Sequence, residues 1–159
     1  LAERVVQTVT RDLPPLAQEA VRWAIEHAAE RPQVSDLASA LALHPRSFLR
    51  EMKTMAMAPP RTLLLWGRLI HASHFLERMD ETVEGVAFGL GYATGGALRK
   101  ALKRHVGCNP TILLKRGGLA WTLEEFRRKG LRRGSGGKNR WAHAGSPRWK
   151  ISPFARRPS

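Results

Sequence analysis

The sequence predicts an all-α protein in which two helix-turn-helix units flank one long linker helix. Apolar residues recur at helical spacing through most of residues 13–118, and no long β-type alternation interrupts them. A short pattern occurs twice, first over residues 34–52 and again over residues 83–102. Between the two copies lies a stretch of 20 residues, 60–79, with a single apolar stripe. These three observations together indicate the fold class.

The stretch from 60 to 79 has the features of a long helix. Pro59 and Pro60 open it, and proline suits the first turn of a helix. The apolar stripe follows at intervals of four, three and four residues and consists of Leu65, Leu69, Ala72 and Leu76. Because 20 helical residues span about 30 Å, this helix is long enough to hold two separate units.

The two flanking copies align residue by residue. Leu41 matches Leu90 at an offset of 49, and Phe48 matches Leu98 at an offset of 50, so the second turn has gained one residue. Each copy reads as a short helix, a tight break and a second amphipathic helix, which is typical of a helix-turn-helix unit. The alternative is two ordinary helical hairpins, which the symmetry about the linker makes the weaker interpretation.

Local signals predict the helix ends within the two copies. His44 is expected at the cap position of the second helix in the first copy, with Pro45 at the first helical position. Thr82 and Thr94 are expected to cap the two helices of the second copy, because their hydroxyls can accept from backbone N–H groups. Gly91 suits the sharp turn between them.

We divide the chain into four segments. Residues 1–12 show no clear helical period and are expected to be a leader or linker. Residues 13–118 form the double helix-turn-helix domain, which includes a helix from Pro15 to about Glu30 and a short helix from Pro110. Residues 119–129 are expected to hold an extra helix opened by a capping box of Thr122 and Glu125. Residues 130–159 are rich in Gly, Ser, Pro and Arg, which is typical of a disordered basic tail.

The positive charge is concentrated at the C-terminal end. The net charge is +14, but residues 1–126 carry 16 Lys or Arg against 13 Asp or Glu. Residues 127–159 carry 11 Lys or Arg and no acid. A nucleic-acid partner must therefore be argued from where the charges lie on the helices, and not from the global charge.

Composition excludes several classes of protein. One cysteine in 159 residues cannot form a disulfide framework and suits a reducing cytoplasm. No apolar run is long enough for a membrane span, so no membrane partner is expected. His71 and His74 have a metal-compatible spacing but no third ligand, and Cys108 has no evident base partner. We expect no metal, no cofactor, no catalytic residue and no enzyme activity.

The amphipathic second helices leave basic residues on their outer faces. In the first copy Phe48 and Met52 face inward, which leaves Arg46, Arg50 and Lys53 outside. The outer positions of the second copy are mostly basic too; they are Arg99, Lys100, Lys103 and Arg104. Arginine can bond a guanine edge in the major groove, and the lysines can neutralise phosphates.

At these residues the sequence resembles the DNA-binding domain of the AraC/XylS family of bacterial transcription regulators. The resemblance covers about residues 16–116 and rests on LASALALHPRSFLREM, on TVEGVAFGLGY and on LRKALKRHVGCNP. It implies about seven helices, with both helix-turn-helix units held on one side of the linker helix. It also implies double-stranded DNA as the partner of a monomer, with RNA polymerase as a further partner.

The resemblance implies roles for particular positions. In the first unit the base-facing positions match Arg46, Leu49 and Arg50. In the second unit they match Gly95, Gly96, Arg99 and Lys100. The two glycines depart from the family pattern, since they have no side chain to reach a base. The second unit is therefore expected to hold phosphates more than it reads sequence.

The function predicted from the sequence is a sequence-specific transcription regulator that places two recognition helices in successive major grooves. Two alternatives stay open. One is a non-specific nucleic-acid binder driven by the basic tail, in which Trp141 and Trp149 stack on bases. The other is a helix-turn-helix module that binds protein.

Overall fold

Nine α-helices occur in the described part of the computed structural model, residues 1–78 and 80–133. In chain order they are α1 (Ala2–Val9), α2 (Pro15–Glu26), α3 (Val34–Ala40), α4 (Pro45–Thr54), α5 (Pro60–Glu77), α6 (Val83–Gly89), α7 (Gly95–Ala101), α8 (Pro110–Lys115) and α9 (Leu119–Glu125). Three short helical segments follow α2, α7 and α9; they are the 3₁₀ turn η1 (Ala28–Glu30) and the π turns η2 (Leu102–Val106) and η3 (Phe126–Gly130). The predicted all-α fold class is confirmed.

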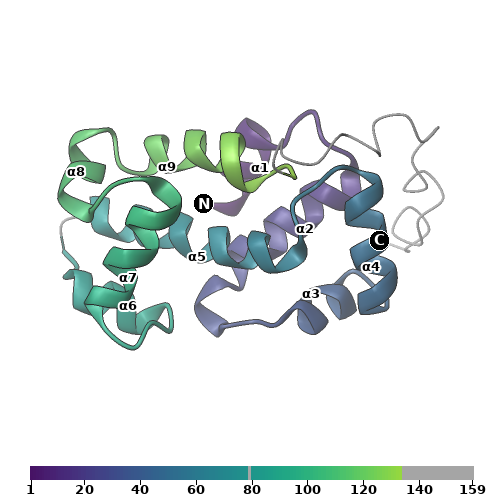
Figure 1. The fold of residues 1–159 in the computed structure, drawn as a ribbon, viewed down its shortest axis with the longest axis horizontal. Helices are drawn as coiled ribbons and strands as arrows, with labels where there is room; N and C mark the ends of the chain where they lie inside the picture. The colour runs from purple at the N-terminus through teal and green to yellow at the C-terminus, as the bar shows by residue number, and fades with distance from the viewer. Residues whose placement is uncertain (79, 134–159) are drawn as a thin grey trace.

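Helix α5 is the element around which the others pack. Ten of its 18 residues are buried, on more than one side of the helix, as expected of a helix in the centre of a core. It contacts α2, α3, α6, α8 and α9. Figure 1 shows α5 crossing the middle of the molecule, with α3 and α4 toward one end and α6 and α7 toward the other. The linker helix expected from the sequence is therefore also the core of the fold.

The backbones of α2 and α5 approach each other closely at Gly67. A Cβ atom at Gly67 would lie 2.4 Å from the carbonyl oxygen of Ala24. One turn further along α5, Nε2 of His71 lies 2.6 Å from the carbonyl oxygen of Ile25. A glycine at 67 thus permits the contact on which the tight α2–α5 packing depends.

Residues 1–12 are not the linker that we expected, because Ala2–Val9 form helix α1. Its buried residues are Ala2, Val5, Val6 and Val9, which recur at the spacing of one helix face. The helix packs on α2 and α9. The three valines have low helix propensity, and packing against the core overrides this local preference.

The capping box predicted from Thr122 and Glu125 is wrong. Helix α9 begins at Leu119, and Thr122 is buried inside it, where its hydroxyl donates to the carbonyl oxygen of Gly118. Thr122 Oγ1 also lies 2.6 Å from Oγ of Ser73. The N-terminus of α9 is instead capped from α5, since the Glu77 carboxylate accepts from the backbone N–H of Leu119 at 2.6 Å. A cap supplied by a distant helix leaves no local sequence signal.

The start of the expected tail is part of the folded domain. Leu131 is buried, and its carbonyl oxygen accepts from the backbone N–H of Ala58 at 3.0 Å. Arg132 forms an isolated antiparallel β-bridge with Met57, so residues 130–133 pack on the loop between α4 and α5. The rest of the predicted disordered tail lies outside the described residues.

The remaining expected elements agree closely with the structure. The first unit comprises α3 and α4, the linker is α5, the second unit comprises α6 and α7, and α8 begins at Pro110. Helix α2 stops earlier than expected, at Glu26, and the 3₁₀ turn η1 covers part of the remainder. The helix count exceeds seven because α1 and α9 lie outside the repeated pattern.

Candidate nucleic-acid interface

The two helix-turn-helix units share one turn geometry. Ala42 in the first turn has φ +55°, and Gly91 at the matching position has φ +82°. In the first turn the backbone N–H of Leu43 donates to Ala38 at 2.9 Å, and in the second turn Tyr92 donates to Ala87 at the same distance. This left-handed ending satisfies the last carbonyls of the first helix in each unit. The repeat seen in the sequence is therefore a repeat of backbone geometry.

Side chains cap the second helix of each unit. Nδ1 of His44 accepts from the backbone N–H of Arg46 at 3.2 Å at the start of α4. Oγ1 of Thr94 accepts from the backbone N–H of Ala97 at 3.1 Å at the start of α7. Both caps were predicted from the sequence, and both fix where the outward-facing residues begin.

Helix α4 presents a basic outer face. Its inner face is fixed by Phe48 and Met52, both 0% exposed. On the outer face all of the predicted contact residues are exposed; they are Arg46, Leu49, Arg50 and Lys53. In the described part of the chain, none of the three cations takes part in an ion pair. Their charges are thus free to meet an anionic partner.

The second recognition segment runs through α7 into the π turn η2. Leu98, Leu102 and Val106 are buried beneath it. The exposed basic residues on it are Arg99, Lys100, Lys103 and Arg104. Gly107, with φ +91°, ends the segment, and its N–H donates to Leu102 at 3.0 Å. The two units thus carry comparable numbers of exposed cations on helices of different form.

The two glycines at the start of α7 have different surroundings. Gly96 is exposed, whereas Gly95 is buried. A Cβ at Gly95 would lie 2.7 Å from Oε1 of Glu84 and 3.2 Å from Nη1 of Arg99. Gly95 is therefore covered by two charged side chains, and it is not an open gap in the surface.

Sequence reasoning missed the ion pair that covers Gly95. Nη2 of Arg99 donates to Oε1 of Glu84 at 2.9 Å, with both side chains substantially exposed. The backbone N–H of Glu84 and the Arg99 guanidinium hold the pKa of the Glu84 carboxyl below its usual range. The two residues are 15 positions apart and lie on different helices, so no helical spacing pointed to the pair.

A second missed contact joins the linker to the second turn. The guanidinium of Arg68 on α5 lies 5.3 Å from the ring centroid of Tyr92, within the range of a cation–π interaction. Burial raises the pKa of the Tyr92 hydroxyl, and its oxygen is buried without a hydrogen-bond partner in the described residues. Arg68 thus helps to fix the second turn on α5.

The recognition helices lie toward opposite ends of α5. Figure 1 shows α4 beside one end of the linker helix and α7 beside the other. The structure therefore brings the predicted residues together as two groups, one on each unit.

His71 and Cys108, which were considered for metal binding and nucleophilic chemistry, are half-buried and buried, respectively. The ring of His71 bonds to α2, and burial lowers its pKa. Cys108 is buried, and burial raises the pKa of its thiol, which disfavours the reactive thiolate. The described residues contain no group of three His, Cys, Asp or Glu side chains that could hold a metal ion.

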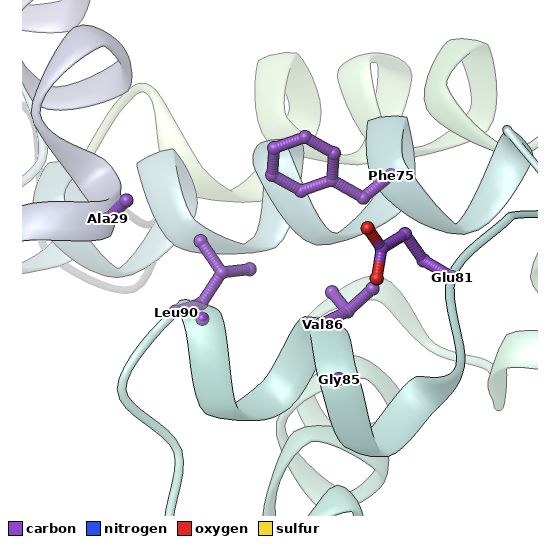
Figure 2. A pocket seen from close by; sticks show the side chains of 7 residues that line it. Ala29, Phe75, Glu81, Gly85, Val86 and Leu90 are labelled. Carbon is purple, nitrogen blue, oxygen red and sulfur yellow. The ribbon is translucent and has the colours of Figure 1, made fainter.

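A half-open cavity of about 270 Å³ lies between η1, α5 and α6, as Figure 2 shows. Its walls are mostly apolar and include Phe75, Val86 and Leu90, and one carboxylate, that of Glu81, stands beside them. One carboxylate beside apolar walls does not form a general acid–base pair.

Among the described residues, no helix has the length and apolar character needed to cross a membrane.

Comparisons with known proteins agree with this geometry. A family model described as a helix-turn-helix domain matches residues 37–116, which is half of the chain and runs from within α3 to the end of α8. The HTH-type transcriptional activator RhaS of Escherichia fergusonii is 29% identical over 90 residues, which cover 57% of this chain. The match spans about a third of that relative, 32% of its length. No solved structure matches the chain. From the tandem units and the family match together, the chain belongs to the AraC/XylS family of DNA-binding transcription regulators.

Proposed function

We propose that the chain binds double-stranded DNA in a sequence-specific manner, with α4 and α7 in successive major grooves. The observation that carries the proposal is the pair of equivalent helices with exposed cations, held by a single buried helix. Helix α5 has 18 residues and so a length of about 27 Å. Successive major-groove faces on one side of B-DNA lie ~34 Å apart. One copy of the chain would then cover two half-sites.

The chemistry of each position follows from its charge and shape. Arg46 and Arg50 lie one turn apart on α4 and can bond guanine edges. Leu49 between them is 39% exposed and can contact a thymine methyl. The phosphate contacts are assigned to the other lysine and arginine side chains, which are Lys53, Lys100, Lys103 and Arg104.

The two units are proposed to read DNA unequally. Gly95 and Gly96 offer no side chain to a base, so Arg99 and Lys100 are left to contact the second half-site. The proposed footprint has two half-sites about 10 bp apart, one sharply specified and one loosely specified. If the glycines allow a bent or widened step, the second half-site is read through DNA shape.

The experiment that tests the proposal is selection of binding sites from a random duplex pool, followed by scanning of every base pair of a selected site. We expect a strong preference, one protein per duplex and a footprint of two unequal half-sites. Binding without preference would favour the non-specific nucleic-acid binder. Absence of any salt-dependent affinity for DNA would favour the protein-binding module.

A truncation separates the helices from the basic tail. Deletion of residues 134–159 removes six Lys or Arg and no acid, and it keeps Leu131 in the core. We expect lower non-specific affinity and a flatter dependence on salt, with the preference among sequences unchanged. Loss of the preference among sequences would show that the tail, and not the helices, recognises the base sequence. The deletion starts after residue 133, because Gly130 and Leu131 are both buried.

RNA polymerase is the protein partner that we propose for the DNA-bound chain, which would place the protein in the cytoplasm. Phe88 on α6 is 76% exposed and offers an apolar side chain that a protein partner could contact. Replacement of Phe88 with Ser should lower transcription from a reporter promoter and leave DNA affinity unchanged. An equal loss of transcription and of DNA affinity would show that Phe88 supports DNA binding and not a contact with RNA polymerase.

A further inference from the structure

The ion pair between Glu84 and Arg99 lies on the part of the second unit that is proposed to face DNA. It joins α6 to α7 by one charge-assisted hydrogen bond of 2.9 Å. The Glu84 side chain is 65% exposed and the Arg99 side chain 46% exposed. An exposed ion pair of this kind contributes little to the stability of the fold, so we consider its effect on DNA binding.

The pair depends on the absence of a side chain at Gly95. A Cβ at that position would lie 2.7 Å from Oε1 of Glu84 and 3.2 Å from Nη1 of Arg99. Any other residue there would push the two charged groups aside. The glycine that seemed to weaken base reading therefore makes room for an oriented arginine.

The first unit has no counterpart of this arrangement. The positions that match Glu84, Gly95 and Arg99 are occupied by Ser35, Pro45 and Leu49. Serine and leucine cannot form an ion pair, and among the described residues the cations of α4 have no ion-pair partner. The pair thus distinguishes the second unit from the first.

The pair of Glu84 and Arg99 lowers the general affinity for DNA, but it also holds the arginine in one orientation. A carboxylate close to DNA repels the phosphates, so it lowers attraction to every duplex equally. The guanidinium of arginine is a planar group with five N–H donors, and one bond to Glu84 leaves the others available. Because Glu84 holds the guanidinium plane before binding, less side-chain entropy is lost when Arg99 contacts a base.

We propose that Glu84 is a specificity-determining residue of the second unit, which orients Arg99 over Gly95 so that the guanidinium reads one base pair. This inference rests on the proposed function, because it requires that α7 enters the groove. Glu84 acts through Arg99 and is a positioning residue. It lowers general affinity for DNA and raises discrimination within the second half-site.

The test compares affinities for a selected site, for each of its single-base-pair variants and for an unrelated duplex. A good bidentate arginine contact gives about 5- to 150-fold discrimination against a wrong base. We expect Glu84→Ala to lose most of that discrimination at one base pair of the second half-site and to bind the unrelated duplex more tightly. Glu84→Gln keeps an oxygen acceptor for Arg99 and should retain part of the discrimination.

Three further variants separate orientation from charge. Glu81→Gln removes one negative charge nearby without touching the pair, so discrimination should stay at the wild-type level. Gly95→Ala should lose the same discrimination as Glu84→Ala, since its Cβ displaces the same side chains, but it keeps the carboxylate and should not bind the unrelated duplex more tightly. In an Arg99→Ala background, Glu84→Ala should cause no further loss at that base pair.

The outcomes distinguish this inference from the proposed function. A wild-type protein with no preference among duplexes overturns both. A wild-type preference that is unchanged at every base pair in Glu84→Ala overturns this inference alone. Equal loss of discrimination in Glu81→Gln and Glu84→Ala also overturns it, because charge and not orientation would then be the cause.

Discussion

The two helix-turn-helix units have the same backbone but different surfaces. Their turns end in matching left-handed residues, and the bond from Leu43 to Ala38 recurs from Tyr92 to Ala87 at the same length. Yet α4 is a regular helix of ten residues that starts with Pro45, whereas α7 has seven residues and continues as a π turn. The comparison shows that the backbone of a repeat can persist while the chemistry of its outer face changes.

The difference in charge is the more informative one. The cations of α4 are unpaired in the described structure, while Arg99 of α7 is bonded to Glu84. The first unit therefore offers cations without an ion-pair partner in the described residues, and the second offers one arginine that is held by a carboxylate. The predictions below test whether the units are equal in packing, in DNA reading and in turn strain, and whether α5 and the second unit respond to pH in different ranges.

The largest effect is expected from the matched core positions Phe48 and Leu98, both 0% exposed. Phe48→Ala should lower the free energy of unfolding by about 3–5 kcal/mol, and Leu98→Ala by about 2–5 kcal/mol. Because both units pack on α5, each variant should still unfold in a single transition, measured by tryptophan fluorescence in denaturant. Two separate transitions would show that the units are independent.

The next effect concerns DNA reading by the first unit. Arg46→Ala or Arg50→Ala should each reduce discrimination at one or two base pairs of one half-site by ~1–3 kcal/mol. Lys103→Ala is the control, and it should weaken binding to all duplexes almost equally, as expected of a phosphate contact. Binding-site selection that gives the same preferences for the wild type and for the Arg46→Ala, Arg50→Ala double variant would contradict the assignment.

A smaller effect is expected at the two turns. Ala42 has φ +55°, which L-residues adopt only with strain, so Ala42→Gly should stabilise the protein by about 0.5–1 kcal/mol. Gly91→Ala should destabilise it by about 1–2 kcal/mol, because the φ of +82° disfavours alanine. The Cβ would also lie 2.4 Å from Nε of Arg31, a side chain that can move. Thermal unfolding of both variants checks the two signs, and equal signs would refute the argument.

The repeated elements could be predicted from the sequence because their signals are local. Apolar spacing located the linker helix, and residues such as His44 and Thr94 marked helix starts that the structure confirms. The matched offsets predicted two units with one extra residue in the second turn. Each of these inferences uses residues within a few positions of one another.

The errors arose where distant segments decide the structure. Helix α1 is formed by valines that packing on α2 holds in place, and α9 is capped by Glu77 from another helix. The pair of Glu84 with Arg99 also joins two helices. Sequence spacing predicted which recognition residues are exposed, but it carried no information on which of them are paired.

The smallest effect is a pH dependence of stability, for which His71 on α5 and the second unit are expected to respond in different pH ranges. His71 bonds to Ile25 through Nε2, and its Nδ1 is buried without a hydrogen-bond partner among the described residues, so a charged ring would bury an unsatisfied N–H. Burial, opposed in part by that bond, holds the pKa of His71 below its ordinary value of 6.5. The unfolded chain therefore takes up the proton first, and stability is full above pH 6.5 and falls as the pH drops toward the folded pKa.

The pair of Glu84 and Arg99 should respond in a lower pH window. The pKa of the Glu84 carboxyl lies below its ordinary value of 4.5, so the pair is intact above that pH and is lost only as the pH falls through the folded pKa. Between pH 6.5 and 4.5 the protein should thus lose stability while the second unit keeps its oriented arginine. Denaturant unfolding across this range should show a smaller decline for His71→Gln than for the wild type. Some decline should remain in that variant, because burial also lowers the pKa of His105. Identical pH profiles for wild type and His71→Gln would show that the ring of His71 does not contribute.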